Sequence, residues 1–179
     1  PPRVQLRDYQ RRDLPQIVKT LREVGRALVA YCVGAGKTKI ALAAAAELVA
    51  GGDVSHVVVL VPNRVIREQF LEERGIVESD RETVLLSFWN TPSARRKSDL
   101  LLDYLAEERP QSVYVCTYRV FSDPEMRDLV LERAKLLGKN LLLVIDEAHH
   151  VHADDEEKSH IAAARLECLP HGTRSLRLS

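Results

Sequence analysis

Five consecutive residues near the start of the chain, Gly34-Ala35-Gly36-Lys37-Thr38, have the types and order needed to bind phosphate. The two glycines let successive backbone N–H groups turn toward one anion, and a helix starting there directs its positive end at the same point. Lys37 would reach the β- and γ-phosphates of ATP, and the Thr38 hydroxyl would ligate Mg²⁺. The full Walker A pattern begins with a glycine at the position of Tyr31. The motif is therefore imperfect and needs support from elsewhere in the chain.

Two acidic residues that follow the most hydrophobic segment, Leu141 to Ile145, give that support. In P-loop nucleotidases, a buried strand ends in an acidic residue that holds the Mg²⁺ of the nucleotide, and Asp146 fits this role. Glu147, one residue later, could orient and deprotonate the attacking water. Ligands of open parallel sheets lie at the carboxyl ends of the strands, so residues 34–38 and 146–147 can converge. The sequence predicts ATP and Mg²⁺ as cofactors.

The elements around these residues predict an α/β domain with a central, mostly parallel sheet and helices on both faces, because apolar segments alternate with segments of helical period. At 179 residues and 45% hydrophobic content, we expect one domain over residues 1–179. Pro15 lies inside the first helical segment, so we expect a kink or break near Asp13. The predicted strands are the apolar run that begins at Ala27 and residues 56–62, 82–87, 112–118, 141–145 and 174–179. The predicted helices are residues 6–25, 39–48, 64–74, 98–107 and one opened by Asp123-Pro124 and closed by Gly138.

Composition limits the class of protein. Basic and acidic residues both number 26, so net charge gives no argument for nucleic acid. Three widely spaced cysteines suit a reducing compartment better than a disulfide framework. No segment approaches the roughly 18 apolar residues of a membrane span. We expect a cytoplasmic protein without membrane contact, or a nuclear one in a eukaryote.

With GAGKT and DEAH both present, the chain resembles the first RecA-like domain of superfamily-two helicases and translocases of the DExH/DEAH type. LRDYQ, residues 6–10, looks like the upstream element whose glutamine, here Gln10, contacts adenine. VVVLVPNRVIREQF and VCTYRVF look like motifs Ia and Ib. The resemblance assigns nucleic-acid contacts to residues of these two motifs, Asn63, Arg64, Thr117 and Tyr118. VIDEAHH is motif II, in which His149 links the nucleotide site to motif III, and RSLRLS leads into motif III with Ser179 as its first residue.

The same resemblance implies that efficient ATP hydrolysis also needs residues of a second domain. The arginine finger of these enzymes comes from a second RecA-like domain, and it contributes on the order of a thousandfold to phosphoryl transfer. We expect this chain to bind nucleotide but to hydrolyse it weakly without that domain. One departure from the family pattern is Val33, where threonine is usual, which removes a hydroxyl but leaves the backbone N–H groups. Another is Asn63 in place of threonine in motif Ia, where an amide still suits phosphate contact.

The leading hypothesis is the ATP-binding motor domain of a DNA or RNA helicase or translocase, with DNA favoured because LRDYQ and the Val-Pro of motif Ia resemble the double-strand translocases. Three kinds of protein could contain this domain: a restriction or defence complex, a repair helicase and a chromatin-type remodeller. The alternative is a nucleotide-gated binding module without motor activity, which a second RecA-like domain would argue against. A P-loop kinase is a third hypothesis, and it lacks this motif order.

Several other clusters have simpler explanations. The spacing of the histidines after motif II matches no firm metal site, and surface residues explain them better. Arg95, Arg96 and Lys97 are expected in a solvated turn rather than a strand-binding patch. Tyr9 is expected to pack in the core of the first helix, and Trp89 beneath a loop.

Overall fold

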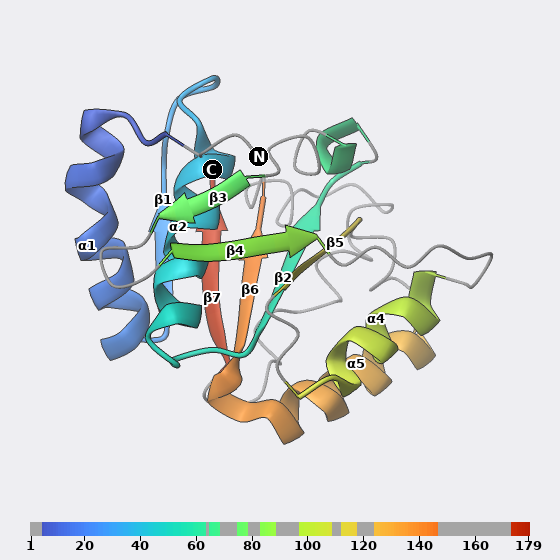
Figure 1. Ribbon diagram of the computed structural model, residues 1–179. Helices are drawn as coiled ribbons and strands as arrows, with labels where there is room; N and C mark the ends of the chain where they lie inside the picture. Colours follow the sequence, from blue (N-terminus) through green and yellow to red (C-terminus); the bar gives the residue numbers. More distant parts are fainter. Residues whose placement is uncertain are drawn as a thin grey trace.

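The computed structural model describes residues 5–63, 65–68, 75–78, 83–88, 97–108, 112–117, 124–146 and 173–179. Strands and helices follow one another in the order that the sequence predicts, with one added strand at residues 75–78 (Figure 1). The strands are β1 (Arg26–Val29), β2 (His56–Val61), β3 (Gly75–Glu78), β4 (Thr83–Phe88), β5 (Ser112–Thr117), β6 (Leu141–Ile145) and β7 (Arg174–Leu178). The helices are α1 (Asp8–Glu23), α2 (Lys37–Ala50), α4 (Lys97–Ala106) and α5 (Pro124–Leu137), the last followed by a 3-10 turn, η2 (Gly138–Asn140). Residues 65–68 are also helical.

The strands form one seven-stranded sheet in the order β1-β7-β6-β2-β5-β4-β3. Every neighbouring pair is parallel except β3 and β4. The central, mostly parallel sheet is thus confirmed. The ends of the central strands are level, because Val29 lies opposite Leu178, Leu60 opposite Ile145, and Val61 opposite Thr117. The carboxyl ends of β1, β7, β6, β2 and β5 therefore lie at one edge of the sheet.

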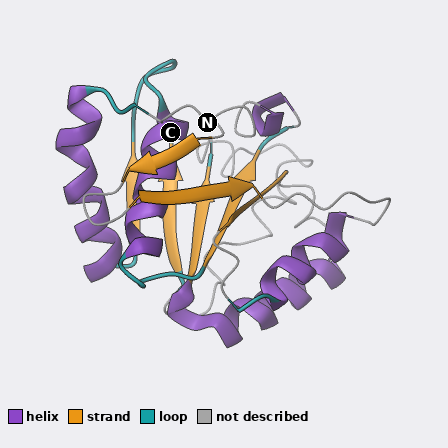
Figure 2. Ribbon diagram, viewed as in Figure 1, coloured by secondary structure: helices purple, strands orange, loops and turns teal. Residues whose placement is uncertain are grey.

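Helices cover both faces of this sheet (Figure 2). In β2, Val57, Val59 and Val61 belong to the hydrophobic core that contains α1 and α2, whereas Val58 and Leu60 belong to the core that contains α4 and α5. Burial on both faces explains why the strand sequence is continuously apolar rather than alternating. Helix α2 is buried nearly all round, since β3 and β4 also lie beside it (Figure 1).

Of the kink or break expected near Asp13, the break is wrong, because α1 is continuous from Asp8 to Glu23 with Pro15 inside it. An interior proline costs about 3 kcal/mol through a lost hydrogen bond and a steric clash. Val18 and Leu21, on the same helix, are buried in the core. Burial of two such side chains contributes roughly 3 to 6 kcal/mol, which is enough to keep the helix whole.

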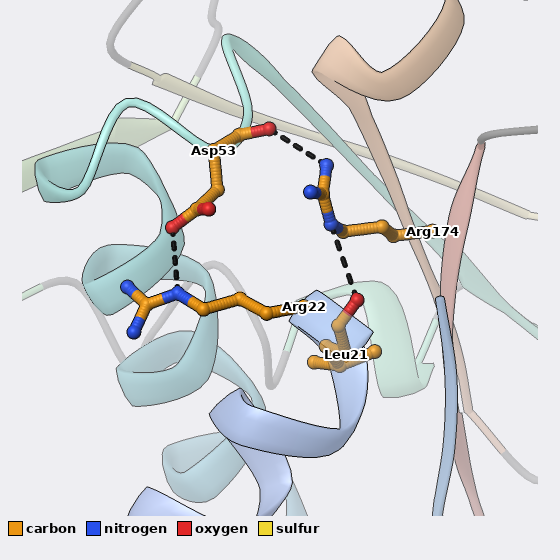
Figure 3. Close-up of polar contacts among 4 residues, drawn as sticks. All are labelled: Leu21, Arg22, Asp53 and Arg174. Atoms are coloured by element: carbon orange, nitrogen blue, oxygen red, sulfur yellow. Dashed lines mark hydrogen bonds and ion pairs between the residues drawn. The ribbon is translucent and has the colours of Figure 1, made fainter. Parts of the chain in front are cut away.

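A polar network fixes the carboxyl end of α1 to the amino-terminal edge of the sheet (Figure 3). Arg174, at the start of β7, donates from Nε to the Leu21 carbonyl at 3.2 Å and from Nη1 to the Asp53 carbonyl at 2.7 Å. The Asp53 carboxylate accepts from Nε of Arg22 at 2.8 Å. Carbonyls in the last turn of a helix have no partner within the helix, and Arg174 supplies one. This network sets the position of α1, whose other end lies at the phosphate loop.

Candidate active site

The predicted phosphate loop lies between β1 and α2. The strand ends at Val29, earlier than the apolar sequence suggests, and residues 30–36 form the loop. Gly34 and Gly36 have φ of 78° and 76°, in the left-handed region that favours glycine. Gly36 is the N-cap of α2, and its carbonyl accepts from the Ile40 N–H at 3.3 Å. The sequence of strand, glycine-containing loop and helix is therefore as predicted.

Lys37 and Thr38 are the first two residues of α2, and both are partly buried. Ala35 is buried, while Val33 is 96% exposed. The first helical turn leaves N–H groups without helical partners, and the helix dipole adds positive potential at the same point. This end of α2 is electrostatically suited to an anion such as phosphate.

Two side chains of α1 contact the main chain of the loop. The Gln10 amide, 1% exposed, donates from Nε2 to the carbonyls of Ala35 at 3.1 Å and Gly36 at 2.9 Å. Its Oε1 accepts from the Arg7 N–H at 2.8 Å. The Tyr9 hydroxyl also donates to the Ala35 carbonyl. Sequence reasoning placed Gln10 near the nucleotide but missed these loop contacts.

Tyr31, at the position of the missing Walker A glycine, joins the loop to α1 through two contacts. Its hydroxyl donates to Oδ2 of Asp13 at 2.9 Å, and its ring packs edge-on against Tyr9 with centroids 5.4 Å apart. Burial, followed by the hydrogen bond with Asp13, raises the pKa of Tyr31 to about 12, so the hydroxyl keeps its proton at neutral pH. Beside Asp13, Arg12 and then Tyr31 lower the pKa of the Asp13 carboxyl. A large residue where glycine is usual was the sequence signal for this role.

Ser179, which the resemblance assigns to motif III, is adjacent to the loop. The Tyr31 N–H donates to the Ser179 carbonyl at 3.0 Å, and the Ser179 N–H donates to the Val29 carbonyl at 3.0 Å. These bonds extend the β1–β7 pairing beyond the strands. Figure 1 places the carboxyl end of the chain beside the segment that joins β1 to α2.

Asp146 directly follows β6 and is 6% exposed. Its N–H donates to the Leu60 carbonyl at 2.9 Å, which ties the residue to the end of β2. Strand β6 is two places from β1 in the sheet, which corresponds to about 10 Å. Glu147 and His149 lie outside the described residues, as do His150 and His152.

Of the four predicted nucleic-acid contacts, Asn63 and Thr117 are described, and Arg64 and Tyr118 fall outside the described ranges. Asn63 is exposed just after β2, and its Oδ1 accepts from the Ile66 N–H at 3.0 Å, as in a helix N-cap. Thr117, the last residue of β5, is partly buried. The register of β2 and β5 brings the two residues to neighbouring positions on the same edge.

The metal ligands predicted from the sequence are Thr38 and Asp146, and both belong to the described part of the chain. That part contains no group of three or more His, Cys, Asp or Glu side chains that could hold a metal ion. A threonine hydroxyl and a carboxylate are oxygen ligands of the kind Mg²⁺ prefers, and Mg²⁺ usually takes its other ligands from water and phosphate. The donor set of Thr38 and Asp146 thus fits Mg²⁺.

Comparison with known proteins identifies the fold and the family. Residues 3–174 match the family described as "Type III restriction enzyme, res subunit". The chain belongs to this family. The res-subunit domain is a helicase-like domain, namely the first RecA-like domain of superfamily two, as the motifs predicted. Comparison with curated protein sequences finds no significant match.

Two solved structures resemble the res-subunit domain. A nuclease-deletion mutant of the Type ISP restriction-modification enzyme LlaGI, in complex with a DNA substrate mimic, matches 98% of this chain with a TM-score of 0.62 and 18% identity. The ATP-dependent Type ISP restriction-modification enzyme LlaBIII, bound to DNA, matches 98% of it with a TM-score of 0.68 and 18% identity. The match covers only 17% and 13% of those two chains. The likeness establishes the fold.

Across the ranges that the structure describes, none of the helices has the length and apolar character of a membrane span.

Proposed function

We propose that this res-subunit domain is the ATP-binding motor domain of a DNA-dependent ATPase, in which hydrolysis drives movement along DNA. The main support for this proposal is that the described nucleotide-site residues follow neighbouring strands at the carboxyl edge of the sheet. The phosphate loop follows β1, Ser179 follows β7, and Asp146 follows β6, in neighbouring strands. This arrangement allows one nucleotide to contact the loop and the acidic residue together.

In this proposal, the N–H groups of residues 34–38 and the Lys37 ammonium bind the phosphates of ATP. Thr38 and Asp146 would hold Mg²⁺, which when bound would neutralise charge on the triphosphate. Glu147 accepts a proton from water as the water oxygen bonds to the γ-phosphorus. The bond from that phosphorus to the β–γ bridging oxygen breaks, and ADP and phosphate leave. From the family resemblance, we expect Gln10 to contact adenine.

DNA would bind farther along the same edge, at Asn63, Arg64, Thr117 and Tyr118. One of the two similar structures is described as in complex with a DNA substrate mimic and the other as bound to DNA, and this favours DNA over RNA. Ser179 and His149 would couple the two sites, because motif III begins beside the phosphate loop. The hydrogen bonds of Ser179 to Val29 and Tyr31 give that coupling a physical route.

The expected partners are a second RecA-like domain and the other subunits of a restriction complex. The second domain would contribute an arginine finger, worth on the order of a thousandfold or more in rate. Closure of the two domains on ATP and their reopening after hydrolysis would provide the step along DNA. The res-subunit domain on its own would bind ATP and hydrolyse it slowly.

The direct test is DNA-stimulated ATP hydrolysis by the full-length protein. We expect Lys37→Ala to lose ATP binding, because the ammonium is the main side-chain charge on the phosphates. We expect Glu147→Gln to bind ATP and lower kcat by roughly 100-fold or more, the usual contribution of a general base. Lys19→Ala, an exposed lysine on α1, is the control and should behave as the wild type.

Unchanged turnover in both Lys37→Ala and Glu147→Gln would overturn the assignment. A wild-type protein that binds ATP but shows no DNA-stimulated turnover would support a nucleotide-gated binding module instead. Displacement of a third strand from a DNA triplex during hydrolysis separates movement along DNA from hydrolysis alone.

A further inference from the structure

The amide of Gln10 is held by the main chain on both its donor and its acceptor side. Both N–H groups of Nε2 are engaged, one by the Ala35 carbonyl and the other by the Gly36 carbonyl. Oε1 accepts from the Arg7 N–H in a capping box at the start of α1. With 1% of its surface exposed, Gln10 is the most buried polar side chain that α1 contributes to the loop.

The direction of these contacts matters for phosphate binding. In a planar trans peptide, a carbonyl and the N–H of the next residue point in opposite directions. The Ala35 carbonyl accepts from Gln10 and Tyr9 of α1, and the Gly36 carbonyl accepts from Gln10 as well as from the Ile40 N–H of α2. The N–H groups of Gly36 and Lys37 therefore point away from these donors. Those are two of the N–H groups on which a phosphate loop depends.

We propose that Gln10 is a positioning residue for the phosphates, which orients the N–H groups of Gly36 and Lys37 by holding the preceding carbonyls. This inference rests on the proposed function, because it concerns the same nucleotide site. Its consequence is that Gln10 governs binding of any polyphosphate, whichever base is attached.

This role competes with the adenine contact expected from the family. An amide that pairs with the edge of adenine uses one donor and one acceptor, toward N7 and the 6-amino group. Gln10 has committed both donors to the loop, and loop contact must break before either can reach a base. A positioning role requires no such change.

The surroundings of Gln10 support the same role. Tyr9, one residue earlier, donates to the Ala35 carbonyl as well, so two side chains fix one loop carbonyl. A Cβ at Gly36 would lie 2.7 Å from Nε2 of Gln10, so the close approach of amide and loop requires glycine. Arg174 anchors the opposite end of α1, and the helix is therefore held at both ends (Figure 3).

The test compares three ligands with Mg²⁺ on the full-length protein by isothermal titration calorimetry: ATP, GTP and inorganic tripolyphosphate, which has no base. We expect Gln10→Ala to weaken all three by the same factor, about thirtyfold, because two hydrogen bonds to the loop that each contribute about 1 kcal/mol are lost. The KM values for ATP and GTP hydrolysis should rise together. Gln16→Ala is the matched control, an exposed glutamine on the same helix that contacts Thr20 and not the loop.

Loss of ATP affinity with unchanged tripolyphosphate affinity in Gln10→Ala would overturn the inference and assign Gln10 to the base. If Gln10→Ala unfolds at a lower temperature than Gln16→Ala, Tyr9→Phe decides the matter, since it removes one hydroxyl. An equal loss for all three ligands in Tyr9→Phe supports positioning, and no loss contradicts it. Failure of the wild type to bind any of the ligands is a different result, which would count against the proposed nucleotide site itself.

Discussion

At the scale of single residues, two separate properties require glycine at position 36: a positive φ and a close contact with the Gln10 amide. Its φ of 76° is one that other residues adopt at a cost of about 1 to 2 kcal/mol. Its Cα also faces the Gln10 amide so closely that a methyl group would lie 2.7 Å from Nε2. Gly34 has nearly the same φ, 78°, with no atom within 4 Å of an added Cβ. Substitution of Gly34 therefore introduces backbone strain alone, whereas substitution of Gly36 introduces backbone strain and a steric contact with Gln10.

We predict that Gly34→Ala and Gly36→Ala both lower the unfolding temperature, and that Gly36→Ala lowers it further because it displaces Gln10. Its ATP affinity should fall correspondingly more. The measurements are thermal unfolding and ATP titration of the full-length variants. Equal losses in the two variants would mean that the contact with Gln10 contributes nothing.

At the scale of elements, a buried polar cluster joins β2, α4 and β5 at the amino-terminal edge of the sheet, away from the phosphate loop. His56 is fully buried, donates from Nε2 to the Glu107 carbonyl at 2.7 Å and accepts at Nδ1 from the Ser55 hydroxyl at 2.7 Å. The Tyr104 hydroxyl accepts from the Val57 N–H at 2.8 Å and lies 2.7 Å from the Ser112 carbonyl. These bonds satisfy main-chain groups where the strands begin.

This cluster predicts a loss of stability in mild acid. Burial lowers the pKa of His56 and outweighs the carbonyl contacts that raise it. In the folded chain, His56 therefore binds a proton only at a pH below 6.5, the ordinary pKa of histidine. As pH falls past that value, the unfolded chain is protonated first, and the free energy of unfolding decreases. The unfolding temperature should therefore drop between about pH 7.5 and about pH 5.5. His56→Gln, which does not titrate, should reduce that drop; an identical pH profile in the variant would contradict the prediction.

Elements were predictable from the sequence where the local pattern decides them. The apolar run of β2 and the loop-to-helix junction at Lys37 are examples, since burial on both faces and the glycines act locally. Strand β3 was not predicted, because its four residues carry little signal and depend on pairing with β4. The continuity of α1 through Pro15 and the contact of Gln10 with Ala35 depend on where α1 packs. Gln10 and Ala35 are 25 residues apart in the sequence, so no local sequence pattern predicts their contact.

At the scale of the whole molecule, the sheet sets the distances between the proposed sites. From β1 to β6 there are two strand spacings, about 10 Å, so the phosphate loop and Asp146 can share one nucleotide. From β1 to β5 there are four, about 19 Å, so Thr117 lies beyond direct reach of the phosphates. The edge therefore separates the proposed nucleotide contacts, at the phosphate loop and Asp146, from the proposed DNA contact at Thr117.

The separation predicts that Thr117→Val weakens DNA binding without changing ATP affinity in the absence of DNA. Valine keeps the β-branched shape at the end of β5 and removes only the hydroxyl, so the fold should be retained. Loss of one phosphate hydrogen bond should reduce DNA affinity by roughly fivefold. DNA titration and ATP titration of the full-length protein measure the two effects, and Thr20→Val, on α1, is the matched control. If Thr117→Val instead lowers ATP affinity and leaves DNA affinity unchanged, the proposed division of the edge is wrong, because a residue four strands away would then be acting on the phosphate loop.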